Sequence, residues 1–294
     1  MISKNKYGFY ELTNKPSEEE LKEYYKRKYF QEGKGTYQLV YSEEELRYIL
    51  NKIEQKYYAF KELLPSKEKY NLLDIGCGEG FCLKYFKEKG WDILGCDYSD
   101  FGIKAHNPEY VNDVLSGDVN EHLTMLASEK KRFDVIWLDN VLEHVLNPLH
   151  LLQLCKRLIY DTGLLIIEVP NDFSELQQKL YEHKMINCRY WIAVPDHISY
   201  FNKEGLINIC NEAGWFHQTI LSDFPIDFNL SNPHSNYVEN KTTGRGAHQQ
   251  RVFLDNLFHG ISIEGTNKLY QALADMGLGR QVIGVFNCNQ TSEI

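Results

Sequence analysis

The residue pattern with the clearest chemical meaning is a glycine-rich stretch. It runs Asp74-Ile75-Gly76-Cys77-Gly78-Glu79-Gly80-Phe81 and follows a short apolar run. Glycines at alternate positions let the backbone turn tightly and approach a ligand, and a following helix points free N–H groups at that ligand. The dinucleotide fingerprint has the spacing G-x-G-x-x-G, and Phe81 stands where its last glycine would be. The stretch therefore predicts a nucleotide-type ligand and argues against a nicotinamide.

Acidic residues end the next two apolar runs. Asp97, followed by Tyr98, ends one of them, and a carboxylate there can accept hydrogen bonds from both hydroxyls of a ribose. Asp118 ends the other and precedes Val119. Its carboxylate could accept from an adenine amino group while Val119 packs on the base. Either acid alone is explained as well by an ordinary loop or turn.

The elements that must position these residues alternate between short apolar runs and helical stretches. We expect strands at 71–75, 92–97, 110–115, 133–138, 163–169, 216–222 and 281–287. We expect helices between them at 80–89, 99–106, 120–129, 147–159 and 203–213. This alternation predicts an α/β fold with a doubly wound, mostly parallel seven-stranded sheet. Ligands of such sheets bind beyond the carboxyl ends of the strands.

Two further zones flank this core, which we place at 67–222 plus 280–294. Residues 1–66 are rich in tyrosine and predict a helical cap, with capping boxes at Ser17 and Ser42. Its rings, Tyr10 among them, either close a pocket or pack the cap on the core. Residues 223–279 form an insertion before the last strand. It starts irregularly, with Gly244-Arg245-Gly246 in that part, and continues as helices at 247–259 and 263–276.

As an ordered set, these motifs resemble class I S-adenosylmethionine-dependent methyltransferases. The fourth strand adds Asp139, Asn140 and the pair Glu143-His144. Glu168-Val169-Pro170-Asn171 and a later His197-x-x-Tyr200 resemble the ubiquinone-biosynthesis type of small-molecule O-methyltransferases and related sugar methyltransferases.

The resemblance implies a role for each motif. The residues implied to hold S-adenosylmethionine are Asp74, Gly76, Cys77, Gly78, Gly80, Phe81, Asp97, Tyr98, Asp118, Val119, Asp139 and Asn140. Asp97 would hold the ribose, Asp118 and Val119 the adenine, and Asp139 and Asn140 the methionyl group. A metal ion is not required. Some ubiquinone-type relatives bind a divalent ion through a carboxylate three residues before the Glu-His pair, and that position is Asn140 here.

Methyl transfer to a hydroxyl or ammonium also needs a proton acceptor. His197, which follows Asp196, is our candidate base, and a structural histidine is the alternative. We take Tyr10, Asn171, Tyr200 and Arg245 as candidate acceptor-binding residues. An arginine between glycines suits a phosphate, so the insertion could read an anionic acceptor such as a nucleotide-linked sugar.

Composition narrows the function classes. The 294 residues carry a formal charge of −9, which disfavours nucleic acid as a partner. No apolar run suits a membrane span and no signal segment is seen, so we expect a cytoplasmic protein. The 7 cysteines include no C-x-x-C pair and predict neither a disulfide framework nor a zinc site. We expect methyl transfer to an oxygen of a sugar or related metabolite in surface-glycan or cofactor synthesis. A macromolecular acceptor and a non-catalytic cofactor-binding module are the alternatives, and the oligomeric state is left open.

Overall fold

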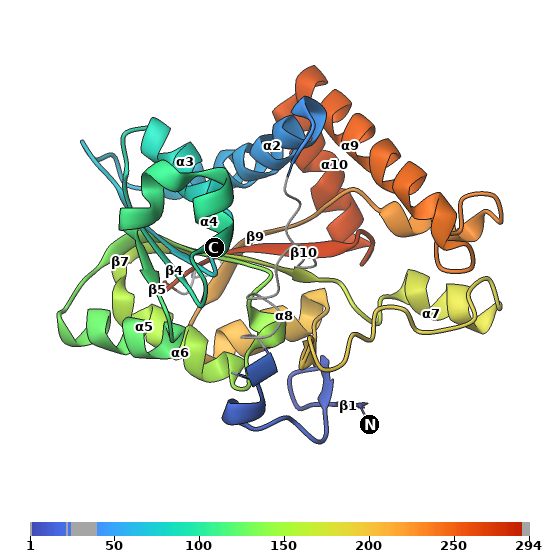
Figure 1. The fold of residues 1–294 in the computed structure, drawn as a ribbon, viewed down its shortest axis with the longest axis horizontal. Helices are drawn as coiled ribbons and strands as arrows, with labels where there is room; N and C mark the ends of the chain where they lie inside the picture. The colour runs from blue at the N-terminus through green and yellow to red at the C-terminus, as the bar shows by residue number, and fades with distance from the viewer. Residues whose placement is uncertain (1, 22, 25–39, 290–294) are drawn as a thin grey trace.

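A seven-stranded sheet forms the centre of the protein in the computed structural model, which describes residues 2–21, 23–24 and 40–289 (Figure 1). The strand order is β5-β4-β3-β6-β7-β10-β9. The strands are β3 (Asn71–Ile75), β4 (Asp92–Asp97), β5 (Val114–Ser116), β6 (Phe133–Asp139), β7 (Ile159–Pro170), β9 (Phe216–Ser222) and β10 (Gln281–Asn287). The strands from β3 to β7 pair in parallel, and β10 pairs antiparallel with both β7 and β9. The predicted fold class is confirmed.

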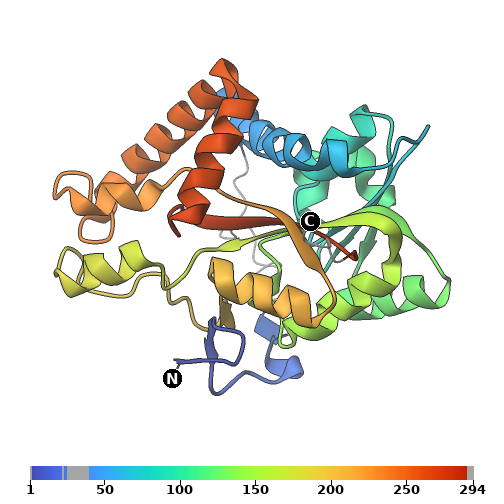
Figure 2. The same cartoon turned by 180° about the vertical axis from the view of Figure 1, so that it is seen from behind.

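Helices cover both faces of the sheet. One face carries α5 (Val119–Ser128), α6 (Pro148–Leu158) and α8 (Lys203–Glu212), and the other carries α2 (Glu43–Phe60), α3 (Phe81–Glu88), α4 (Phe101–His106) and α10 (Ile263–Asp275). Figure 2 shows the same two layers from behind. Neighbouring strand residues point to opposite faces, so Leu72 packs in one apolar cluster and Leu73 in the other. The strand ends between the layers are left to bind ligands.

The third predicted strand was wrong over most of its length. We expected it at 110–115, but β5 begins only at Val114, and a 3₁₀ helix, η2 (Pro108–Asp113), precedes it. Pro108 has no N–H and a fixed φ, which suits the first turn of a helix. Tyr110 and Val111 pack against the core from this helix, so the apolar signal was that of a buried turn.

The N-terminal zone contains strands as well as the expected helices. The capping boxes form, since Ser17 Oγ accepts from Glu20 N–H and Ser42 caps α2. Ahead of them, β1 (Ile2–Lys4) and β2 (Tyr10–Leu12) form a hairpin that pairs with β8 (Ser199–Tyr200). We had expected only helices in this zone. The hairpin is held on the core by Phe9, whose ring centroid lies 4.4 Å from that of Phe201.

The insertion follows β9 and differs from the prediction at one point. It contains η4 (Ile226–Ser231), η5 (Lys241–Thr243), α9 (Gly244–Ile261) and α10. The stretch Gly244-Arg245-Gly246, expected to be irregular, is the first turn of α9. The two glycines suggested a loop, but α9 begins at Gly244 because η5 leads directly into it. A further helix, α7 (Glu175–Glu182), follows β7. Among the described helices, none is long and apolar enough to cross a membrane.

Candidate active site

A cavity of about 770 Å³ opens at the carboxyl ends of the parallel strands. This is the edge where doubly wound sheets bind their ligands. The predicted cofactor residues that line it are Gly76, Gly78, Asp97, Tyr98, Asp118, Val119, Asp139 and Asn140. The described part of its wall does not include Asp74, Cys77, Gly80 or Phe81. The strand ends thus bring most of the predicted set to one place.

The glycine-rich turn requires glycine for steric reasons. Gly76, Gly78 and Gly80 all have positive φ, at 74°, 49° and 77°. A Cβ atom on Gly76 would lie 2.6 Å from Cγ2 of Val141, a residue that also lines the cavity. The turn is fixed to β4 because Gly76 N–H donates to Cys96 O at 2.7 Å. A larger residue would therefore push the turn into the ligand space or away from β4.

Two of the acids hold backbone groups of the cavity wall. The carboxylate of Asp97, 8% exposed, accepts from Gly78 N–H at 2.9 Å and Ser99 N–H at 3.0 Å. Burial raises its pKa and these N–H groups oppose the rise. Asp118 caps α5, accepting from Asn120 N–H at 3.0 Å. Each carboxylate oxygen has a second lone pair, so both acids can also accept from a ligand.

Asp74 has a different place from the one that we expected. It is 3% exposed and does not reach the described cavity wall. Burial raises its pKa well above the usual range, and the charges of Asp139 and Asp97 add to that rise. It therefore contributes to the wall from behind, as a buried neighbour of the residues that line the cavity.

Sequence reasoning missed an ion-pair network behind Asp139. Lys56 of α2 contacts Asp139 and lies 2.5 Å from Glu168 Oε2, while Lys52 lies 2.8 Å from Glu168 Oε1. Although burial opposes it, the two lysines lower the pKa of Glu168 to about 2. A signal was present in the helical spacing. Lys56 falls on the apolar face of α2, three residues after the buried Ile53.

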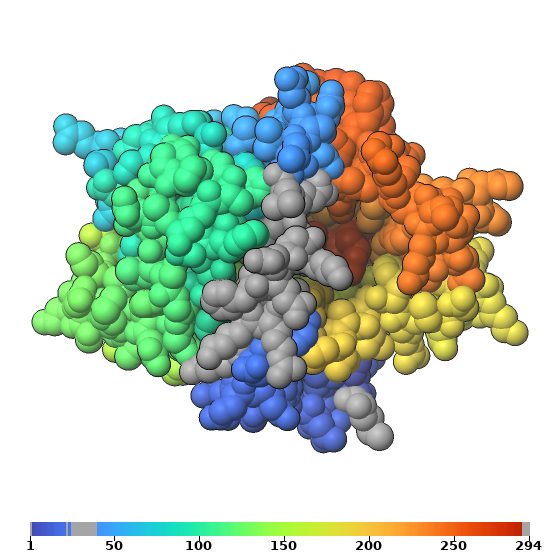
Figure 3. Space-filling model, in the orientation of Figure 1, coloured from blue at the N-terminus to red at the C-terminus, as the bar shows by residue number. Residues whose placement is uncertain are grey.

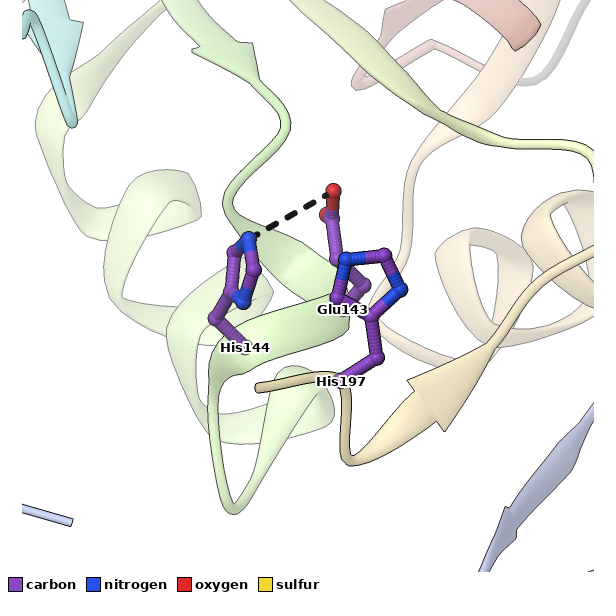
Figure 4. A group of neighbouring side chains, drawn as sticks. All are labelled: Glu143, His144 and His197. Atoms are coloured by element: carbon purple, nitrogen blue, oxygen red, sulfur yellow. Dashed lines mark ion pairs between the residues drawn. The ribbon is translucent and has the colours of Figure 1, made fainter. Parts of the chain in front are cut away.

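A histidine cluster lies beside the cavity, and Figure 4 shows its members Glu143, His144 and His197. His144, in η3 (Leu142–His144), lines the cavity, and its ring centroid lies 4.9 Å from that of His197. His144 Nδ1 lies 2.8 Å from Asp196 O, and Nε2 lies 3.8 Å from Glu143 Oε1. Burial raises the pKa of Glu143 well above its usual range. His197 thus lies against a cavity residue, but is not itself on the described wall.

This cluster also has the composition of a metal site. One ligand atom each from Glu143, His144 and His197 all lie within 4.8 Å of one another. Histidine nitrogen and carboxylate oxygen are the ligand types of Zn²⁺ and of several other divalent ions. The cluster could therefore hold an ion. The carboxylate that some ubiquinone-type relatives place three residues before the Glu-His pair is replaced by Asn140 here.

The four predicted acceptor residues lie elsewhere, and none of them is on the described cavity wall. Tyr10 stacks on Phe173 with ring centroids 4.0 Å apart. The buried Asn171 donates to Gly277 O and Gly279 O. Tyr200 donates to His197 O at 3.0 Å.

The remaining one, Arg245, is exposed in the first turn of α9. Tyr10, Asn171 and Tyr200 make contacts that hold neighbouring segments together. Tyr200, in particular, holds the backbone of the histidine cluster.

Comparisons with known proteins find one matching family and several similar proteins. The family described as "Methyltransferase domain" matches residues 31–216. A ubiquinone biosynthesis O-methyltransferase of Cereibacter sphaeroides is 33% identical over 105 residues, which is 35% of this chain and 42% of that protein. The enzyme of the same description from Nitrosomonas europaea is 27% identical over 169 residues, 54% of this chain and 69% of that protein. The first match thus spans less than half of the relative.

A solved S-adenosylmethionine-dependent methyltransferase from Archaeoglobus fulgidus is 20% identical, with a TM-score of 0.49 over 80% of this chain and 93% of that one. The family match covers more than half of the chain. It includes the glycine-rich turn and the acids at the ends of the following strands. On the evidence of this family match, the chain belongs to the methyltransferase-domain family.

Proposed function

We propose that the protein transfers a methyl group from S-adenosylmethionine to an oxygen of a small polar molecule. The observation that carries the proposal is the juxtaposition at one cavity. Acids suited to a nucleoside line the cavity together with His144, and the ring of His197 lies beside that of His144, with ring centroids 4.9 Å apart. The cofactor supplies a methyl group on a positively charged sulfur. An acceptor held in line with that bond needs only orientation and the loss of a proton.

The residues of the wall fit each part of this cofactor. Asp97 would accept from the ribose hydroxyls, Asp118 and Val119 would hold the adenine, and Asp139 and Asn140 the methionyl group. Buried Asp139 Oδ1 supports this assignment, since it has no hydrogen-bond partner within the described part of the chain. An ammonium group is a partner that such an oxygen can take.

The proton acceptor belongs to the histidine pair. His197 remains the candidate base, and His144, which reaches the cavity itself, is positioned to pass the proton to it or to act alone. Replacing each with glutamine separates the two roles. Replacing the histidine that acts as the base should lower kcat and leave the affinity for the cofactor unchanged. The loss of kcat should become smaller as the pH rises. Equal wild-type rates in both variants would remove the pair from the mechanism.

For the acceptor, we propose a sugar, a nucleotide-linked sugar or a related metabolite. The two relatives named above are O-methyltransferases, which supports oxygen as the acceptor atom. Figure 3 shows a hollow bounded by α9 in orange and by the yellow segment around α7, with red β10 at its floor. Arg280, which directly precedes β10, is matched by Asp172 at 2.9 Å. An anionic acceptor therefore depends on other cations, such as Arg245.

The experiment uses methyl-labelled S-adenosylmethionine, the purified protein and fractionated extract of its own cells. Label in small metabolites supports the proposal, and mass spectrometry then identifies the acceptor and the methylated atom. The ionic behaviour of the labelled product decides whether the acceptor is anionic. Label confined to polymer would assign a macromolecular acceptor instead. Cofactor binding without labelling of any fraction would indicate a non-catalytic binding module.

A further inference from the structure

Two lysines of α2 lie in the interior, at the carboxyl edge of the sheet. The side chain of Lys56 is 2% exposed and that of Lys52 is 17% exposed. The same helix packs apolar residues, Ile53 and Phe60, into the core around Trp137. Burying an ammonium group is unfavourable unless it is paired, and apolar residues in place of a buried ion pair are often neutral or stabilising. Packing alone therefore does not explain why these positions carry lysine.

The ion pairs form a chain that ends at the cofactor cavity. Lys52 binds Glu168, Glu168 binds Lys56, and Lys56 binds Asp139 Oδ2. Asp139 and Glu168 are partners across β6 and β7, so the sheet fixes their spacing. Two positive and two negative groups leave the chain without net charge. Its last member, Asp139, is the one that lines the cavity.

The two oxygens of Asp139 have different surroundings. Oδ2 is bound by Lys56, while Oδ1 has no hydrogen-bond partner among the described residues. Burial raises the pKa of Asp139, Lys56 opposes the rise, and Glu168 adds to it. The other titratable groups that act on this site are Lys52 on α2, Asp74 on β3 and Cys82 on α3. Lys56 is thus the cation in direct contact with Asp139.

We propose that Lys56 is a positioning residue for the cofactor, because its ion pair holds the cavity-lining carboxylate of Asp139 charged and in place for the ammonium of the methionyl group. The proposal rests on the proposed function in that the cofactor is S-adenosylmethionine. Lys56 itself does not reach the described cavity wall. It acts only through Asp139, and that restriction makes the idea testable.

The test measures binding of S-adenosylhomocysteine by calorimetry between pH 6 and pH 8, in the wild type and in Lys56→Met. Removing a contacting cation raises the pKa of a carboxyl group by about 1–3 units. Lys56→Met should therefore bind S-adenosylhomocysteine more weakly at pH 6 than at pH 8, and this loss on lowering the pH should be larger than in the wild type. Lys56→Arg, which keeps the charge, should restore most of the wild-type profile.

Lys67→Met is the matched control. Lys67 pairs with the buried Asp134 at the opposite end of the same strand, far from the cavity wall. Its removal should leave binding and its pH profile unchanged. A folded Lys56→Met protein with the wild-type affinity and pH profile would overturn the proposal.

Asp139→Asn keeps the proposal testable if Lys56→Met does not fold. Because Lys56 acts only through Asp139, Asp139→Asn and the double variant Asp139→Asn/Lys56→Met should bind S-adenosylhomocysteine equally, without a pH slope. A further loss in the double variant would overturn the proposal and leave the proposed function intact. A wild-type protein that does not bind S-adenosylhomocysteine at any pH would overturn both.

Discussion

Asp97→Asn is the sharpest test of the cofactor site. The carboxylate accepts two backbone N–H groups, from Gly78 at 2.9 Å and from Ser99 at 3.0 Å. An asparagine has the same size but only one acceptor oxygen, so its NH₂ group faces one of these donors. A buried donor left without an acceptor costs about 1–3 kcal/mol. At roughly 2–4 °C per kcal/mol, Tm should fall by about 2–12 °C.

Cofactor binding should fall as well, because the asparagine cannot offer the ribose a charged acceptor. A hydrogen bond to a charged group contributes about 1.5–3 kcal/mol, which corresponds to a roughly 10- to 150-fold weaker Kd for S-adenosylhomocysteine. Differential scanning fluorimetry and titration calorimetry measure the two effects separately. Asp92→Asn is the control, since Asp92 begins the same strand and its side chain is 56% exposed. Unchanged affinity in a folded Asp97→Asn protein would refute the assignment.

Three other predictions follow from the site. Gly76→Ala should lower both Tm and the thermal shift caused by S-adenosylhomocysteine, because its Cβ would meet Val141 at 2.6 Å. The control is Gly90→Ala, which should lower Tm alone, because Gly90 has a positive φ but nothing lies within 4 Å of the added Cβ. The ion pairs of Glu168 stabilise the fold above pH 4.5 and are lost as pH falls toward about 2, so the urea midpoint should drop more steeply over that range in the wild type than in Glu168→Gln. Methyl transfer should survive dialysis against EDTA, since displacement from a sulfonium releases a neutral sulfide, which needs no metal ion to stabilise it. A different result would identify a metal site at the histidine cluster: activity that is lost on dialysis and restored by Mg²⁺ or Zn²⁺ in the wild type, but not in Glu143→Gln.

The α/β fold and the cofactor wall follow from local patterns in the sequence. Apolar runs that alternate with amphipathic stretches specify a parallel sheet, because each strand is buried on both faces and each helix on one. Such strands all end at one edge, and polar residues that directly follow them must meet there. Gly76, Asp97, Asp118 and Asp139 meet in this way at the cavity. Sequence alone was sufficient because short-range patterning decides which residues stand at the strand ends.

Local patterns were misleading where tertiary packing used the same residues differently. Tyr110 and Val111 read as strand residues, but they are buried from a 3₁₀ helix that Pro108 begins. Gly244 and Gly246 suggested a loop, but both lie in the first turn of α9. At 108–113, Pro108 and the burial of the following side chains decided the backbone; at 244–246, the chain that enters from η5 decided it.

The pairings that complete the site depended on the tertiary structure. Nothing in the spacing of Lys56 and Asp139 predicts that they touch, since the helix that carries the lysine must first pack across the sheet. His197 likewise meets His144 only because β8 and its flanking loop return to the end of β6. Burial then makes these contacts matter, because an ion pair out of water shifts the pKa of its members far more than one at the surface. The sequence thus determined which groups stand at the strand ends, and the packing of distant segments decided their charge and their partners.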